Sequence, residues 1–232
     1  MALLELRHVS RAHGGAAQPR LALEDVCLDL YAGELVAVWG QRRSGRSTLL
    51  RVASGIEAPD RGAVLFEGRE LARAGGDPRI ALCREPERPP ATPSLHEALL
   101  RDLLAMGRRP AQAARLAAGA LERAGAAEAA GLRPCDLDSA QRVRACIARA
   151  LLCSPRLLLI DEPLLGVPAS AQEALIELLG GLAAEGIAVL FSTDEAGAFH
   201  GAVQRTLALD RGRLRGQLSP PAAEVLPLRR PA

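Results

Sequence analysis

The sequence contains no lysine, so all 29 of its basic residues are arginine. Aromatic residues are scarce, with one Trp, one Tyr and three Phe among 232 residues. Because proteins bind single-stranded nucleic acid by stacking bases on aromatic side chains, this chain has little with which to do so. The basic residues are nearly balanced by 27 acidic ones and are scattered along the chain. We therefore expect that nucleic acid is not a partner.

The sequence also lacks paired cysteines and long apolar runs. Its five cysteines are widely spaced without a C-x-x-C pair, which disfavours a disulfide framework or a zinc site and indicates a reducing compartment. No apolar run approaches the ~20 residues that span a bilayer, and MALLELRHVS lacks the charged start and the cleavage site of a signal peptide. These absences predict a soluble chain, and they are compatible with docking on a membrane protein.

Strands and helices are predicted to alternate along most of the chain. The strands expected from apolar runs are residues 2–9, 21–30, 35–39, 63–68, 80–83, 156–160, 187–191 and, as the last, 206–210. The helices expected among them are residues 47–54, 139–152 and 169–182. This alternation predicts a mostly parallel sheet covered on both faces, and the apolar content of 49% is enough for a large core.

A region rich in alanine, leucine and arginine interrupts this alternation after residue 93. Ser94 and Glu97 have the spacing of a capping box, and Pro110 occupies a favoured first-turn position for a second helix. We expect a first part of an α/β core with an antiparallel β edge subdomain in residues 1–93. An α-helical subdomain is expected in 94–140, the second part of the core in 141–218 and a disordered tail in 219–232.

Residues 40–48, GQRRSGRST, join a predicted buried strand to a predicted helix. In the P-loop pattern, glycine followed by four residues and G-K-[ST], backbone N–H groups wrap the phosphates, the lysine reaches the outer phosphates and the hydroxyl holds Mg²⁺. Arg46 stands at the lysine position. The pattern is otherwise matched by Gly40, Gly45, Ser47 and Thr48, and the loop interior consists of Gln41, Arg42, Arg43 and Ser44. Two arginines stand there where small residues are expected.

The second chemical motif is RLLLIDEP, residues 156–163, an apolar strand that ends in two carboxylates. In open α/β sheets, ligands bind at the carboxyl ends of the strands. We therefore expect Asp161 and Glu162 to face the glycine loop, one holding Mg²⁺ through water and the other polarising an attacking water. We also expect Arg43 and Arg46 to converge with these carboxylates and with Asp194 in internal ion pairs.

In order and content, these motifs resemble the nucleotide-binding cassette of ABC transporters over essentially the full chain. The stretch LDSAQRVRACIARALLCSPRLLLIDEP is similar to the LSGGQ signature helix and Walker B strand of that family. The resemblance implies a P-loop NTPase (RecA-like) core with an antiparallel β edge subdomain and an inserted α-helical subdomain. It also implies ATP and Mg²⁺ as ligands, a second cassette in a head-to-tail dimer, and transmembrane permease subunits at the cytoplasmic face of the membrane.

The resemblance assigns roles to individual positions. It places His13 at the adenine-stacking position beside the loop residues 40–48, and Ser47, Glu85 and Asp161 at the metal. Glu162 stands at the catalytic position and Asp194 at the switch histidine. Pro168 stands at the D-loop aspartate, where it also suits the first turn of the next helix. The signature motif corresponds to Leu137, Asp138, Ser139, Ala140 and Gln141.

Several of these positions depart from the family pattern. Arg46 replaces a lysine, and its planar fork differs from a compact ammonium. Arg43 replaces a glycine and is expected to crowd the loop, and Glu85 replaces the Q-loop glutamine. Asp138 replaces the signature serine, where a carboxylate repels phosphate but is also a good helix N-cap. Asp194 replaces the switch histidine and, when ionised, cannot donate a hydrogen bond to a phosphate.

Three functions are consistent with these motifs. The chain is an ATP-binding subunit of an ABC transporter complex with impaired hydrolysis, or a structural or regulatory pseudo-ATPase that binds no nucleotide, or an active homodimeric ATPase with unusual motifs. Loss of transition-state contacts of this kind costs roughly two to four orders of magnitude in rate each, which favours the first. The transported substrate and the direction of transport are properties of the permease, so this sequence does not specify them.

Overall fold

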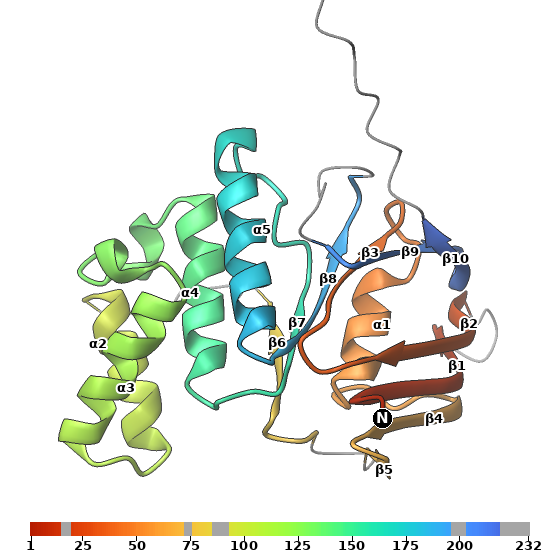
Figure 1. Ribbon diagram of the computed structural model, residues 1–232, viewed down its shortest axis with the longest axis horizontal. Coiled ribbons are helices and arrows are strands. Elements are labelled where there is room, and N and C mark those ends of the chain that lie inside the picture. Colours follow the sequence, from red (N-terminus) through yellow and green to blue (C-terminus); the bar gives the residue numbers. More distant parts are fainter. Residues whose placement is uncertain (15–19, 72–75, 85–92, 196–202, 219–232) are drawn as a thin grey trace, which may run out of the picture.

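The computed structural model describes residues 1–14, 20–71, 76–84, 93–195 and 203–218, whose strands form two sheets (Figure 1). The four-stranded sheet is antiparallel, in the order β2-β1-β4-β5, and the other has six strands in the order β10-β9-β3-β8-β7-β6. The first sheet consists of β1 (Leu4–His13), β2 (Arg20–Leu30), β4 (Arg61–Phe66) and β5 (Arg69–Glu70). The second consists of β3 (Leu35–Trp39), β6 (Ile80–Cys83), β7 (Leu157–Ile160), β8 (Ala188–Thr193), β9 (Arg205–Asp210) and β10 (Arg213–Leu218).

Five neighbouring strands of the larger sheet run parallel, from β9 through β3, β8 and β7 to β6, and only β10 is antiparallel to its neighbour. Strands that run parallel end at the same edge of their sheet. The residues that follow β3, β7 and β8, namely Gly40, Asp161 and Asp194, therefore lie along one edge. This topology brings together motifs that are more than 100 residues apart in sequence.

Helices cover both faces of the larger sheet. Helix α1 (Arg46–Ala53) lies between the two sheets, whereas α4 (Ser139–Leu151) and α5 (Ala169–Ala184) lie on the opposite face (Figure 1). Helices α2 (Leu95–Ala105) and α3 (Pro110–Arg123) pack beside α4, followed by 3₁₀ turns at Ala127–Ala129 and Pro134–Asp136. The Ser94 side chain caps α2 by accepting a hydrogen bond from the Glu97 N–H at 3.1 Å, and Pro110 begins α3 as predicted.

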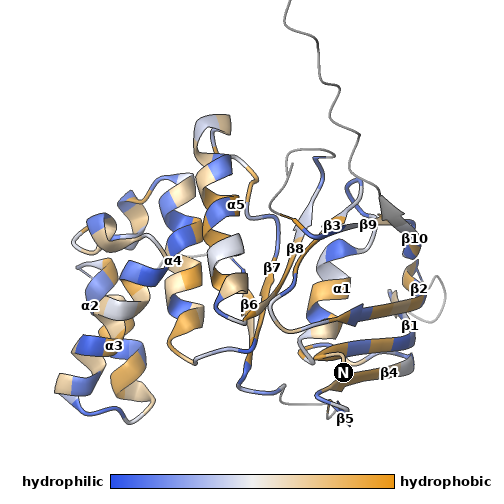
Figure 2. Ribbon diagram, viewed as in Figure 1, coloured by the Kyte–Doolittle hydropathy of each residue, from blue (hydrophilic) through white to orange (hydrophobic). Residues whose placement is uncertain are grey.

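The core is divided in two by the larger sheet, because successive side chains of a strand point to opposite faces. Leu35 and Ala37 pack with helices α2 to α5, whereas Val36 and Val38 pack with α1 and the antiparallel sheet. All four side chains are fully buried. Figure 2 shows the resulting concentration of apolar residues along the central strands. A strand buried on both faces reads as a continuous apolar run, which explains why these strands were visible in the sequence.

The predicted α/β fold, with an antiparallel edge sheet and added helices, is confirmed, and two details of the strand prediction are wrong. Residues 206–210 are not the last strand, because β10 pairs with β9 after a tight turn. Its sequence, RLRGQL, has only two apolar residues, so it gives no strand periodicity. The two-residue strand β5 was also not predicted, and residues 219–232 lie outside the described residues. No helix in the described ranges is long and apolar enough to cross a membrane.

A group of ion pairs joins β1 to the end of α1. Glu57 accepts hydrogen bonds from Arg51 Nε at 2.9 Å and from Arg11 Nε at 2.6 Å, and Arg11 also contacts Asp60 at 2.6 Å. Burial disfavours ionisation of Glu57, but the hydrogen bonds from Arg51 and Arg11 outweigh this effect and hold its pKa below the usual 4.5. The ionised carboxylate therefore stabilises the packing of the antiparallel sheet on α1.

We predict that Glu57→Gln lowers the free energy of unfolding at pH 7 by roughly 1–3 kcal/mol, because two charge-assisted hydrogen bonds are weakened. Since folding lowers the pKa of Glu57, this stabilisation is present above pH 4.5 and is lost as the pH falls through the folded-state value. Urea unfolding at a series of pH values measures both effects. Glu70→Gln is the control, because Glu70 is exposed. Equal stability losses in the two variants at pH 7 would contradict this role of Glu57.

Candidate functional site

The loop between β3 and α1 depends on two glycines. Gly45 has φ of 109°, in the left-handed region, and a Cβ at this position would lie 2.2 Å from the carbonyl oxygen of Ala22. A Cβ at Gly40 would lie 2.4 Å from the Leu209 carbonyl oxygen and 2.5 Å from Ser44 Oγ. Any residue with a side chain at either position would therefore force the neighbouring backbone to move. These contacts fix the course of the loop around the N-terminus of α1.

The N-terminus of α1 offers unsatisfied hydrogen-bond donors. Within the described part of the chain, no side chain caps this end and no acidic residue lies in its first turn. The first N–H groups of a helix have no intrahelical partner and carry partial positive charge. Ser44 Oγ is buried beside them and has no hydrogen-bond partner among the described residues. The backbone here fits an anion such as a phosphate group.

Arg46, in the first turn of α1, does not point its charge at this anion site. Its side chain is only 5% exposed, Nη1 donates to the carbonyl oxygen of Thr193 at 2.8 Å, and Nη2 forms an ion pair with Glu162 Oε1. Thr193 ends β8, and Glu162 follows β7. The guanidinium thus joins α1 to the ends of two neighbouring strands. In the same contact it neutralises the carboxylate expected to polarise water.

Ser192 holds the two carboxylates that follow β7. Its hydroxyl donates to Asp161 Oδ1 at 2.7 Å and accepts from the Glu162 N–H at 2.8 Å. The next carbonyl, that of Thr193, accepts from both Arg46 and the Gly40 N–H, the latter at 3.1 Å. Sequence analysis missed Ser192 and Thr193. The available signal was a pair of hydroxyl residues at the end of the apolar run IAVLF.

Other charged residues expected at the site lie apart from this ion pair. Arg42 and Arg43 are exposed, and neither forms an ion pair with a described residue. The φ of Arg43 is 68°, and its exposed side chain does not crowd the loop as we expected. Asp194 is also exposed, and its carbonyl oxygen accepts from Trp39 Nε1 at 3.0 Å. The predicted convergence is correct for Arg46 with Glu162 and wrong for Arg43 and Asp194.

His13 lies against the start of α1. Its Nε2 is 3.0 Å from Thr48 Oγ1 and its Nδ1 is 3.4 Å from Glu57 Oε1. Arg51 Nη2 donates to the same Thr48 hydroxyl at 3.1 Å. Both ring nitrogens are therefore engaged within the protein, and the side chain is 41% exposed. The ring lies next to the glycine loop, where its stacking role remains a prediction.

The signature residues surround the N-terminus of α4. Asp138 Oδ1 accepts from the Gln141 N–H at 2.8 Å, and Gln141 Oε1 accepts from the Asp138 N–H at 3.0 Å. This capping box confirms that Asp138 is the N-cap of α4. Leu137 is buried before it, and Ser139 and Ala140 form the first turn. The Asp138 carboxylate therefore stands where an uncapped helix would offer N–H groups to a ligand.

The remaining predicted site residues are more scattered. Pro168 is the exposed N-cap residue of α5, one position before the first turn that we considered. Ser47 is partly buried in the first turn of α1, and Glu85 lies outside the described residues. The described part of the chain contains no group of three or more His, Cys, Asp or Glu side chains placed to hold a metal ion. Ser47 and Asp161 remain as two candidate oxygen donors.

The backbone and the charged side chains of this site are engaged in different ways. The backbone of residues 40–46 and the Ser44 hydroxyl form a cradle for an anion. In contrast, the side-chain cation at Arg46 and the carboxylate of Glu162 are engaged with each other. Glu162 Oε1 accepts a hydrogen bond from Arg46 Nη2 in place of one from water. The arrangement therefore combines an anion-binding backbone with a side-chain ion pair.

Comparison with known proteins agrees with this geometry. The family model described as "ABC transporter" matches residues 23–165, more than half of the chain. The sequence is 32% identical to the pyoverdine export ATP-binding/permease protein PvdT of Pseudomonas syringae pv. tomato, over 83% of this chain and 31% of that protein. It is 34% identical to the aliphatic sulfonates import ATP-binding protein SsuB 2 of Pseudomonas aeruginosa, over 91% of this chain and 73% of that protein. The chain thus spans about a third of the first relative.

Solved structures share the fold at lower sequence identity. The cbiO1 protein of Clostridium perfringens, described as part of the ABC transporter complex cbiONQ, superposes with a TM-score of 0.84 at 20% identity, covering 94% of this chain and 89% of that one. A bacterial ABC transporter cassette solved as a dimer gives a TM-score of 0.80 at 22% identity, covering 93% and 98%. The chain belongs to the ABC transporter family and has the fold of its ATP-binding cassettes.

Proposed function

We propose that this chain is the ATP-binding subunit of an ABC transporter complex and that it binds Mg·ATP weakly and hydrolyses it little or not at all. It acts at the cytoplasmic face of the membrane, beside a second cassette that carries out most of the hydrolysis and beneath transmembrane permease subunits. The ion pair between Arg46 and Glu162 is the observation that carries this proposal. It pairs the Arg46 guanidinium, which stands at the position of the phosphate-binding lysine, with the Glu162 carboxylate, which stands at the position expected to polarise water.

The ion pair competes directly with nucleotide chemistry. To contact a phosphate, the Arg46 guanidinium would have to leave both Glu162 and the Thr193 carbonyl. Separating a pair of which one member is 5% and the other 30% exposed costs roughly 2–3 kcal/mol, between the values for exposed and fully buried pairs. This cost reduces the favourable free energy of ATP binding and corresponds to a Kd about 30- to 150-fold higher.

The retained features support nucleotide binding rather than its complete loss. Gly40, Gly45 and the uncapped N-terminus of α1 preserve the shape of the cradle, and Ser47 and Asp161 preserve two oxygens of the expected Mg²⁺ site. When bound, Mg²⁺ would neutralise phosphate charge there. The relatives are named as ATP-binding proteins of import and export systems, one of them joined to a permease, which supports a permease partner.

A second candidate function is a pseudo-ATPase subunit that binds no nucleotide. The observation that favours it is the engagement of the Thr48 hydroxyl by His13 and Arg51, which occupies a further polar group of the loop. We predict weak but saturable binding of a non-hydrolysable Mg·ATP analogue to the isolated chain, measured by calorimetry. Absence of binding at millimolar analogue would establish the pseudo-ATPase, and ordinary turnover by the isolated chain would establish an active homodimer.

We also predict that Arg46→Lys does not restore hydrolysis to the isolated chain. A lysine would free Glu162 only in part, and the Asp138 carboxylate would still occupy the signature helix while Asp194 still replaced the switch histidine. Steady-state phosphate release by wild type, Arg46→Lys and the exposed control Arg42→Lys measures this. If Arg46→Lys alone restored turnover to the 1 s⁻¹ range typical of enzymes, the arginine at position 46 would by itself account for the loss of hydrolysis.

A further inference from the structure

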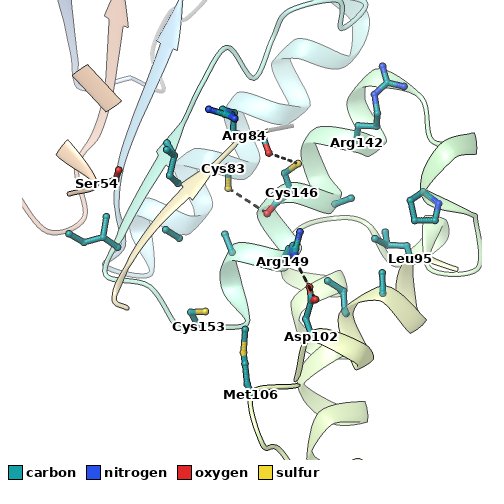
Figure 3. Close-up of a pocket in the computed structure, with 18 of the residues that line it drawn as sticks. Ser54, Cys83, Arg84, Leu95, Asp102, Met106, Arg142, Cys146, Arg149 and Cys153 are labelled. Carbon is teal, nitrogen blue, oxygen red and sulfur yellow. Dashed lines mark hydrogen bonds and ion pairs between the residues drawn. The ribbon is translucent and has the colours of Figure 1, made fainter. Parts of the chain in front are cut away.

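Four of the five cysteines of the chain line one cavity of about 1170 Å³. The cavity lies between the edge strand β6 and helices α2 and α4 (Figure 3), and its lining residues do not include residues 40–48 of the glycine loop. These cysteines are Cys83, Cys135, Cys146 and Cys153. Sequence analysis found no paired motif because the residues come from separate elements. The fold therefore brings cysteines from separate parts of the sequence to the wall of one cavity.

Two of these thiols contact backbone carbonyl groups across the boundary between β6 and α4. Cys83, the last residue of β6, donates from Sγ to the carbonyl oxygen of Cys146 at 3.5 Å. Cys146, on α4, donates from Sγ to the carbonyl oxygen of Arg84, the neighbour of Cys83, at 4.0 Å. Figure 3 shows the two side chains side by side between the strand and the helix. The two cysteines are therefore neighbours across the contact between β6 and α4, and a disulfide requires their sulfurs to approach to ~2.05 Å.

The two thiols differ in their surroundings. Cys83 is only 4% exposed, and burial, with a smaller contribution from the nearby Cys146, raises the pKa of its thiol. Cys146 is partly exposed at the cavity wall. A thiolate is the attacking species in thiol–disulfide exchange, and access is the second requirement. Cys146 is therefore suited to meet an oxidant first, and Cys83 to react afterwards with the adduct.

We propose that Cys83 and Cys146 are a redox-responsive thiol pair that a low-molecular-weight disulfide, such as oxidised glutathione, converts to an intramolecular disulfide. The Cys146 thiolate attacks one sulfur of the oxidant, whose S–S bond breaks and releases one glutathione thiolate. The buried Cys83 thiol then transfers its proton to the glutathione thiolate released in the first step, and its sulfur attacks Cys146 Sγ, releasing the second glutathione thiolate. Two protein thiols are oxidised, and the small disulfide is reduced to two thiols.

The product would join β6 covalently to α4. Strand β6 is an edge strand of the larger sheet, and α4 begins at the Asp138 capping box. The residues between the two cysteines include α2 and α3, so the bond would close a loop around these helices. Oxidation would therefore fix the position of α4 against the sheet. This inference depends on the fold and on the two thiol contacts, and it does not depend on nucleotide binding.

The test treats the purified full chain with oxidised glutathione, blocks remaining thiols and maps disulfides by proteolysis and mass spectrometry. We expect a Cys83–Cys146 disulfide in wild type and in the control Cys153→Ser. In Cys83→Ser, we expect glutathione to remain attached to Cys146, and in Cys146→Ser we expect Cys83 to stay reduced. The same treatment in guanidinium should give mixed pairings among the cysteines.

Two results would overturn the proposal. One is a folded wild-type chain in which Cys83 and Cys146 both stay reduced while Cys153 or Cys135 reacts. The other is a pairing pattern in the folded chain that matches the one obtained in guanidinium. Because the wild-type comparison of folded and denatured protein uses no substitution, it remains decisive even if a serine variant fails to fold.

Discussion

The contact of Arg46 with Glu162 and Thr193 is the interaction on which the arrangement of the site depends. One guanidinium connects the first turn of α1 with the ends of β8 and β7, which lie at the same edge of the sheet. Arginine suits this position because its planar fork directs separate N–H groups at a carbonyl and a carboxylate. A lysine ammonium could not reproduce this geometry. The Arg46 charge is thereby used to hold α1 against the ends of these two strands.

The backbone and the side chains at this site are under different structural constraints. The loop conformation depends on Gly40 and Gly45, whose replacement would bring a Cβ within 2.5 Å of backbone oxygens, so the anion-binding shape is required by packing. The side chains of Asp138 and Asp194 are not confined by such close contacts with backbone, and Asp194 is exposed. Asp138 even stabilises α4 as its N-cap. A cassette can therefore keep its shape and much of its stability while the groups that act on phosphate change.

Much of the fold and part of the site could be predicted from the sequence. The buried parallel strands are continuous apolar runs, and residues 35–39 and 80–83 were predicted with their observed bounds. The polar edge strand β10 has no such signal and was missed. The ion pair of Arg46 with Glu162 followed from the meeting of strand ends at one edge. The exposure of Arg43 could not be predicted in this way, because it depends on a positive φ. The position of Ser192 also could not, because it depends on β8 lying next to β7 in the sheet.

The claim that Arg46 and Glu162 stabilise each other is tested most directly by a double-mutant cycle on the ligand-free chain. The free energy of unfolding would be measured by urea denaturation for wild type, Arg46→Ala, Glu162→Ala and the double variant. We predict a coupling energy of roughly 1–3 kcal/mol, because each single change leaves the partner's charge unpaired in a partly buried position. Additivity of the two changes within about 0.5 kcal/mol would contradict the account, since the two side chains would then act independently.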